Sequence, residues 1–148
     1  MHRILSTLLL ATLTASSVHA MAPPREESPA PRDVLEAFGA GNSDEELASA
    51  IAAANAYPLG TLQNPIRTEG PEGQQAYLAR LRCADGTMPK VGAKTPGGVG
   101  AYGTVVDNVQ LDCGSAAPGK VTLLMDMYHA ENVETRAPAS FTVTTPQP

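Results

Sequence analysis

Two cysteines, Cys83 and Cys113, constrain the fold of this chain more than any other feature of the sequence. Each ends a segment in which apolar and polar side chains alternate, and the two segments are Ala76 to Cys83 and Val105 to Cys113. Alternation with a period of two predicts half-buried strands, here with both cysteines facing the core. A disulfide requires Cα atoms within roughly 4.4–6.8 Å of each other, so the two strand ends must meet. Because a simple hairpin would not bring them together, the strands are either parallel neighbours or members of two facing sheets.

The beginning of the chain has the pattern of a secretory signal peptide. Arg3 supplies the positive end, an apolar run extends from Ile4 to Leu13, and Val18 and Ala20 fit the small-residue cleavage rule. The run is too short to span a membrane. We therefore predict that residues 1–20 are removed, that the mature chain starts at Met21, and that the protein is secreted or periplasmic. An oxidising compartment also favours a disulfide over two free thiols.

The rest of the sequence divides into three segments of different composition. Residues 21–31 are rich in proline and predict a disordered linker, residues 32–57 predict a helical lead-in, and residues 58–145 predict a disulfide-linked β domain. With no Trp and only 4% aromatic residues, the core must consist of Val, Leu, Ala and Met. The predicted fold class is α+β, with short N-terminal helices before a small antiparallel or mixed β-sheet or sandwich.

The helical lead-in contains two predicted helices. The first covers Asp33 to Phe38 and is stopped by the glycines that follow. The second starts with a capping box, in which Ser43 is the N-cap and Glu46 occupies the third helical position, and it extends to about Ala56. Its narrow, alanine-rich stripe favours weak packing on the core over packing on a partner. The stripe consists of Leu47, Ala50, Ile51 and Ala54.

The β domain contains further strand and turn signals. Ile66 and Thr68 predict a short edge strand, Asp85 and Gly86 predict a tight turn, and a final short strand is expected from Ser140 to Thr144. The glycine-rich segment from Thr87 to Gly103 predicts a long loop, and loops of this length are usually functional or disordered.

The strand from Val105 to Cys113 should form a hairpin with a strand from Val121 to His129. The apolar pattern determines its register, because a slip of one residue would mix the buried and exposed faces. The register places Cys113 opposite Gly119, Leu111 opposite Val121, Val109 opposite Leu123, Val105 opposite Met127, Asp112 opposite Lys120 and Thr104 opposite Tyr128.

One glycine motif matches the spacing of a dinucleotide-binding loop, and we reject that interpretation. Gly98 to Gly103 has the G-x-G-x-x-G spacing, but the dinucleotide motif must follow a strand and begin a helix. Here the motif precedes a predicted strand, so we interpret it as part of the flexible loop.

Three acid–base residues near these strands deserve separate interpretations. In a continuous strand Asp126 and His129 would point to opposite faces, and they could converge only if the strand ended near Tyr128, so we favour solvated strand-end groups. Asp107 falls on the apolar face, where an unpaired carboxylate is costly. We favour a bulge that turns it outward over a functional buried acid, with Arg80 and Arg82 as its candidate partners. No established metal-ligand spacing is present in the sequence.

Four short motifs carry a resemblance to other proteins: Asn64-Pro65-Ile66-Arg67, Leu81-Arg82-Cys83-Ala84-Asp85-Gly86, Leu111-Asp112-Cys113 and Met125-Asp126-Met127-Tyr128-His129. In these motifs the chain resembles small exported bacterial proteins of unknown function, over roughly Leu59 to Val143. The resemblance implies no activity and no catalytic residue. A bacterial source would make the periplasm or the medium the destination.

The net charge of −5 argues against a nucleic-acid partner. We expect an exported, non-enzymatic domain that binds a protein or a cell-envelope component, without a cofactor and without stable membrane insertion. A secreted inhibitor of a host or competitor enzyme is one form of this hypothesis. The contact surfaces should be the Thr87–Gly103 loop and the segment from Tyr128 to Glu134, with Tyr102, Tyr128 and His129 as binding residues.

The alternative hypothesis is a small envelope hydrolase or a metal-dependent enzyme that uses Asp107, Asp126 and His129. An enzyme requires these groups to converge in a concave pocket, whereas a binding domain needs only an exposed surface. The position of these three residues therefore separates the two hypotheses.

Overall fold

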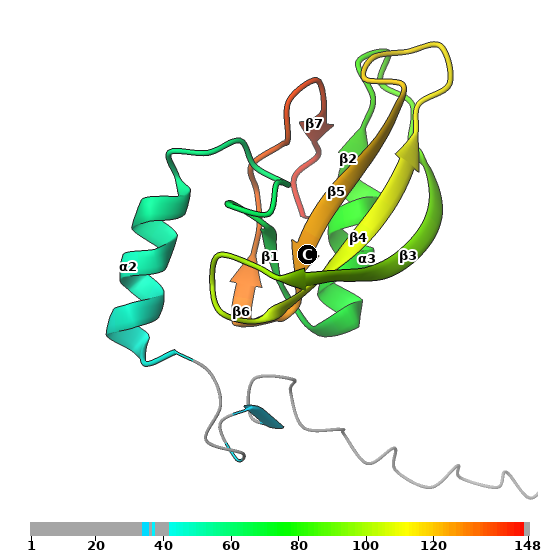
Figure 1. Ribbon diagram of the computed structural model, residues 1–148. Coiled ribbons are helices and arrows are strands. Elements are labelled where there is room, and N and C mark those ends of the chain that lie inside the picture. Colours follow the sequence, from blue (N-terminus) through cyan, green and yellow to red (C-terminus); the bar gives the residue numbers. More distant parts are fainter. Residues whose placement is uncertain (1–33, 36, 38–41, 147–148) are drawn as a thin grey trace, which may run out of the picture.

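The computed structural model describes residues 34–35, 37 and 42–146, and it combines helices with sheets, which confirms the predicted α+β class (Figure 1). The predicted signal peptide, the linker at 21–31 and most of the predicted Asp33–Phe38 helix lie outside the described residues. No helix among the described residues is long and apolar enough to cross a membrane. In chain order the elements are α2 (Asp44–Ala54), β1 (Ile66–Glu69), α3 (Gly70–Arg80), β2 (Leu81–Arg82), β3 (Lys90–Val99), β4 (Val105–Asp112), β5 (Lys120–Asp126), β6 (Tyr128–Val133) and β7 (Thr142–Val143).

The main sheet has five strands in the order β3-β4-β5-β1-β6. β3, β4 and β5 form an antiparallel meander, while β1 pairs parallel with β5 and antiparallel with β6. The prediction of an edge strand at Ile66 and Thr68 is wrong, because β1 lies inside the sheet. Both side chains are buried, and the chain turns at Met127 so that β6 returns along the other side of β1.

The largest correction concerns the predicted strand from Ala76 to Cys83. Gly70–Arg80 is helix α3, and only Leu81 and Arg82 form a strand, β2. Pro71 in the first turn and a run of good helix formers after it favour the helix. Tyr77 and Leu81 are four residues apart, a spacing that fits one face of a helix as well as one face of a strand. The burial of Gln74, Tyr77 and Leu81 follows the helical period.

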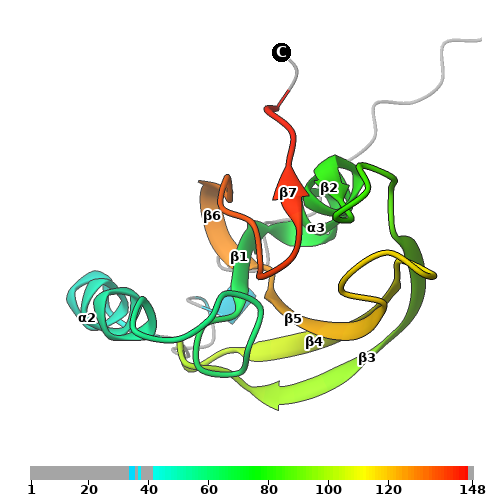
Figure 2. The same ribbon diagram turned by 90° about the horizontal axis from the view of Figure 1, so that it is seen from above.

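The predicted disulfide between Cys83 and Cys113 is present, with a Cα–Cα distance of 5.9 Å. Cys83 follows β2 and Cys113 follows β4, and these strands belong to two separate sheets, as the second alternative required. The smaller sheet pairs β2 with β7, which confirms a short final strand near Ser140–Thr144. Figure 2 shows α3, β2 and β7 on the concave side of the curved β3–β4–β5 meander. The core between these layers consists of Ile66, Tyr77, Leu81, Val109, Leu111, Leu123, Met125 and Phe141 with the disulfide.

The β4–β5 hairpin has the predicted register. Leu111 lies opposite Val121, Val109 opposite Leu123 and Asp112 opposite Lys120, and the Cys113 N–H donates to the Gly119 carbonyl at 2.9 Å. The predicted pairs Val105–Met127 and Thr104–Tyr128 are wrong, because the ladder ends at Asp107 and Met125. β5 ends at Asp126, and Val105 pairs with Val99 of β3 instead.

The long loop predicted from Thr87 to Gly103 is wrong over most of its length. Lys90–Val99 is the ten-residue strand β3 at the edge of the main sheet. Nearly all of its residues are exposed, so it carries no apolar alternation that sequence patterns could reveal. Pro96 is tolerated because an edge strand does not need every N–H group for pairing. The pairing of β3 with β4 shifts register twice, which bends the strand.

Two local predictions are confirmed by hydrogen bonds. In α2, the Ser43 hydroxyl accepts from the Glu46 N–H at 3.3 Å and the Glu46 carboxylate accepts from the Ser43 N–H at 2.9 Å. The helix ends at Ala54, two residues earlier than predicted, and only Ala54 of its apolar stripe is buried. α2 therefore lies beside the sheet and buries only Ala54 of its stripe, so the choice between core and partner packing stays a prediction (Figure 1). Gly86, at φ +83°, donates its N–H to the Cys83 carbonyl in the predicted turn.

Candidate functional site

Asp126 and His129 come together in the structure. The break between β5 and β6 at Met127 removes the strand geometry that would separate them, as the conditional alternative required. The His129 Nε2 lies 3.5 Å from the Asp126 Oδ1 and forms no hydrogen bond among the described residues. The prediction of solvated strand-end groups is wrong, since Asp126 is 0% and His129 only 5% exposed.

The partners of Asp126 form a closed polar cluster. The Thr104 hydroxyl donates to Oδ2 in a short contact, and the Tyr128 N–H donates to Oδ1 at 3.0 Å. In a nucleophilic triad the imidazole stands between the carboxylate and the hydroxyl. Here the carboxylate stands between the hydroxyl and the imidazole, so His129 cannot take a proton from Thr104. The cluster ties the β3–β4 turn to the β5–β6 corner.

Asp107 lies elsewhere. It pairs with Met125, and adjacent residues of a strand point to opposite faces, so Asp107 and Asp126 are on opposite faces of the sheet. The β4–β5 pairing is regular from Asp112 to Asp107, where it ends, so it contains no bulge at Asp107 and Asn108, while the β3–β4 pairing shifts register just beyond Asp107. Its partner is Lys94, at 3.0 Å, rather than either arginine. The structure therefore does not bring Asp107 together with Asp126 and His129.

Gln74 completes a triangle with this ion pair. Its Nε2 donates to the Asp107 Oδ2 at 2.8 Å, and its Oε1 accepts from the Lys94 Nζ at 2.7 Å. Gln74 is buried, and its two hydrogen bonds join α3 to β3 and β4. Asp107, the acid that the sequence singled out, is thus partly exposed and paired within a structural contact.

The three predicted binding residues are mostly inaccessible. Tyr102 and His129 are buried and pack edge to face, with ring centroids 4.9 Å apart. The Tyr102 hydroxyl donates to the Asn64 Oδ1 at 3.1 Å, and burial raises the pKa of this phenol above its ordinary value. Only Tyr128 is partly exposed. In the part of the chain that the structure describes, no three His, Cys, Asp or Glu side chains are placed to hold a metal ion.

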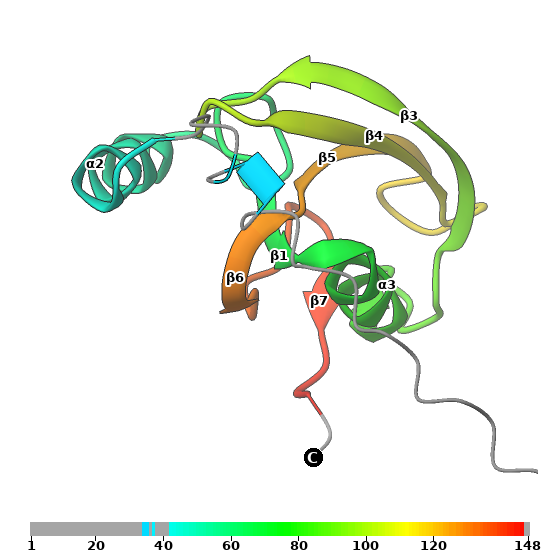
Figure 3. The same ribbon diagram turned by 90° about the horizontal axis from the view of Figure 1, so that it is seen from below.

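A cleft of about 660 Å³ lies between α3, β6 and the C-terminal segment. Figure 3 shows β6 and α3 on either side of β1, which holds them apart. We call this the arginine cleft and define it by Ala76, Ala79, Arg80, Arg82, Asn132 and Val133.

Sequence reasoning missed the cleft because it assigned α3 as a strand. A strand separates Ala79 from Arg80 by face, whereas a helix places Gly73, Ala76 and Arg80 along one side at spacings of three and four. Pro71, which follows Gly70, was the signal that marks a helix start.

Arg80 is held by carbonyl groups. Its Nη2 donates to the Glu134 carbonyl at 2.8 Å, its Nη1 to the Thr144 carbonyl at 3.3 Å, and its Nε to the Ala76 carbonyl at 3.3 Å. The guanidinium carbon lies 5.6 Å from the centre of the Tyr77 ring, a cation–π distance. Burial raises the pKa of the Tyr77 phenol, so this ring is neutral and presents its face to the cation.

Arg82 is also held by carbonyls alone. Its Nη1 donates to the Ala79 and Leu81 carbonyls, both at 2.8 Å. Among the described residues neither Arg82 nor Arg80 forms an ion pair with a carboxylate. Both positive charges in the cleft are therefore fixed in position without a negative partner in the part of the chain that the structure describes.

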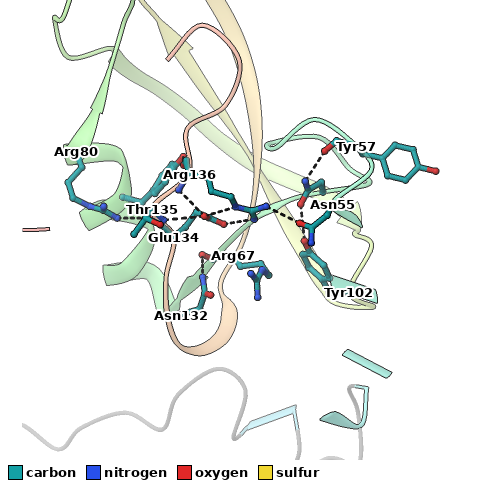
Figure 4. A network of polar contacts seen from close by, with 11 residues as sticks. Asn55, Tyr57, Arg67, Arg80, Tyr102, Asn132, Glu134, Thr135 and Arg136 are labelled. Atoms are coloured by element: carbon teal, nitrogen blue, oxygen red, sulfur yellow. Dashed lines mark hydrogen bonds and ion pairs between the residues drawn. The ribbon is translucent and has the colours of Figure 1, made fainter. Parts of the chain in front are cut away.

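Glu134, which lines the cleft, binds the side chain of Arg136 (Figure 4). Two hydrogen bonds join the guanidinium to the carboxylate, Nε to Oε1 at 3.0 Å and Nη2 to Oε2 at 2.8 Å. Burial alone would raise the pKa of Glu134, but the hydrogen bonds from Arg136 outweigh it and hold the pKa below its usual range. Arg136 also donates to the Asn55 Oδ1, and its carbonyl accepts from the Tyr77 hydroxyl, both at 2.9 Å. The network thus joins α2, α3 and the segment after β6.

Comparison with known proteins gave no match: no family model fits this sequence, and neither a curated protein nor a solved structure is significantly similar to it.

Proposed function

We propose that this protein is an exported, non-enzymatic binding domain that takes its ligand in the arginine cleft. The observation that carries the proposal is the pair Arg80 and Arg82, fixed by backbone carbonyls at a cleft and without carboxylate partners among the described residues. Side chains that are already immobilised lose little conformational freedom on binding. A site with immobilised donors therefore favours the binding of a ligand.

The chemistry of the cleft supports binding rather than catalysis. Its carboxylate, Glu134, is buried against Arg136 and has a lowered pKa, whereas a general base works best with a pKa near the operating pH. Asp126 and His129 are buried in a separate cluster that does not line the cleft. A bound molecule would therefore meet donors and apolar contacts without an activated nucleophile.

The ligand is a protein or a component of the cell envelope. Residues 1–20 have the features of an export signal, and the disulfide suits an oxidising compartment. The four motifs resemble those of small exported bacterial proteins, and a bacterial source would make the periplasm or the medium the destination. These elements of the proposal are tested by sequencing the N-terminus of the exported protein, which should be Met21.

The cleft is tested by nuclear magnetic resonance with the purified, isotope-labelled protein. The probes are soluble fragments that carry a carboxylate, phosphate, sulfate, ammonium or neutral amide group. We expect saturable shifts of the Ala76, Ala79 and Val133 amides, while the amides of β3 stay unchanged. Shifts confined to β3, or no saturable shift in the cleft, would contradict the proposal.

A cleft-filling variant provides a second arm. Ala76→Trp places a large side chain in the cleft from an exposed helical position and should abolish the shifts. Ala48→Trp, on the exposed face of α2, is the matched control and should leave them intact. Hydrolysis of any probe that is lost on His129→Ala would instead support the enzyme hypothesis.

A further inference from the structure

We propose that the arginine cleft binds the terminal carboxylate of an extended peptide with small side chains, between Arg80 and Arg82. This inference rests on the proposed function, because it specifies what the same cleft recognises. Three observations carry it: the unused hydrogen-bond donors of the two arginines, the confinement of positive charge to one end of the cleft, and the small apolar residues beyond them.

The two arginines retain donors for a ligand. A guanidinium has five N–H groups in a planar fork. Arg80 uses three of them on carbonyls, and Arg82 uses the two on Nη1. Arg80 therefore keeps two N–H groups and Arg82 keeps three. Forks of this kind match the two oxygens of a carboxylate, and the resulting charge-assisted bonds are roughly twice as strong as neutral ones.

The distribution of charge favours a single terminal anion. Arg80 and Arg82 are the only cationic residues that line the cleft among those the structure describes, and both lie toward its β2 end. Glu134, the one carboxylate among the described residues that line the cleft, already binds Arg136. A chain of repeated phosphates would place most of its charges where the cleft offers no cation. A ligand with one anionic end places its single charge beside the two arginines and leaves no charge without a cation.

The remaining surface fits a peptide. The helix presents Gly73, Ala76 and Ala79, whose small size leaves room, opposite Val133, which is 62% exposed. A Cβ added at Gly73 would lie 3.3 Å from the Thr68 Cβ, so α3 approaches β1 closely here. Gly73 and Thr68 both line the cleft at this point. Asn132 supplies a side-chain carbonyl that its own hydrogen bond, made through Nδ2, leaves free to accept from a peptide N–H.

The test measures affinity by isothermal titration with N-acetyl-Ala-Ala-Ala. This peptide with a free carboxylate should bind, and the same peptide with a C-terminal amide should bind at least about tenfold more weakly. Inorganic phosphate is the third probe and should bind more weakly than the free peptide. Arg82→Gln should lower the affinity for the peptide acid at least about tenfold and leave the affinity for the peptide amide unchanged. Arg82→Lys should have an intermediate affinity for the acid, because it keeps the positive charge and loses the planar fork of donors.

Lys90→Gln is the matched control, since it removes one positive charge from exposed strand β3 and should leave affinity unchanged. Equal binding of the acid and the amide, or full affinity in Arg82→Gln, would overturn the carboxylate inference. Phosphate that binds as tightly as the peptide and displaces it would overturn the peptide assignment. In each case the resonance shifts at Ala76 and Ala79 show whether the cleft is still the binding site, so the two proposals fail separately.

Discussion

Opening the disulfide should cost a large share of the stability of this domain. Cys83 and Cys113 are separated by 30 residues in sequence, and closing a loop of that length contributes about 3.6 kcal/mol at 25 °C in the chain-entropy model. Small domains are stable by about 5–15 kcal/mol in total. The bond joins the α3–β2–β7 layer to the end of β4, where the Ala84 N–H also donates to the Ala117 carbonyl, and side-chain packing and the Gln74 hydrogen bonds add further links between the layers.

The unfolding free energy lost on opening the disulfide can be measured by urea denaturation, followed by circular dichroism, with and without a reducing agent. Reduction keeps both side chains and removes only the covalent bond, so it isolates the contribution of the loop. The double variant Cys83→Ala/Cys113→Ala should lose somewhat more unfolding free energy than the reduced protein, because it also removes two buried sulfur atoms. A reduced protein that loses less than about 1 kcal/mol would refute the reasoning, since the layers would then be held without the bond.

Three further predictions concern single side chains. The pKa of Glu134 is lowered in the folded state, so its contribution to stability is present above its ordinary pKa of 4.5 and is lost as the pH falls through the folded value. Urea midpoints between pH 7 and pH 3 should show this loss, and Arg136→Gln should lower stability by about 2 kcal/mol at pH 7 and flatten the pH dependence. Gly100→Ala should cost about 1–3 kcal/mol of unfolding free energy, because the new Cβ would lie 2.5 Å from the Val106 Cγ1, and unchanged stability would contradict this placement. Gln74→Ala should cost about 2 kcal/mol through the loss of two hydrogen bonds to a charged pair, and thermal unfolding that matches the parent protein would exclude the triangle.

The features that sequence reasoning predicted well depend on neighbours in the chain. The capping box of Ser43 and Glu46 needs only one helical turn, and the β4–β5 register follows from the alternation on two adjacent segments. The disulfide was predicted from the two cysteines and an oxidising compartment, although the strand predicted before Cys83 was wrong. Local rules thus recovered α2, the hairpin and the covalent bond.

The features that were missed depend on distant partners. Tyr77 and Leu81 fit both a strand and a helix, and the choice depends on packing against the sheet. β3 has no apolar pattern because it is an exposed edge, and its existence depends on pairing with β4. The meeting of Asp126 and His129 required the chain to turn at Met127 and pair with β1. The arginine cleft follows from α3 and β6 together, so the local helix signal at Pro71 could have revealed only one of its two sides.

Strand β1 has both of its partners far downstream, since Ile66 pairs with Met125 and Thr68 with Val133. As the chain is synthesised, β1 therefore emerges with two unpaired backbone edges, and it keeps them until residues 120–133 have followed. Unpaired edges are templates for pairing with other chains. A chain cut short before β5 should thus aggregate rather than fold in part, and a complete chain must close its sheet in one late step.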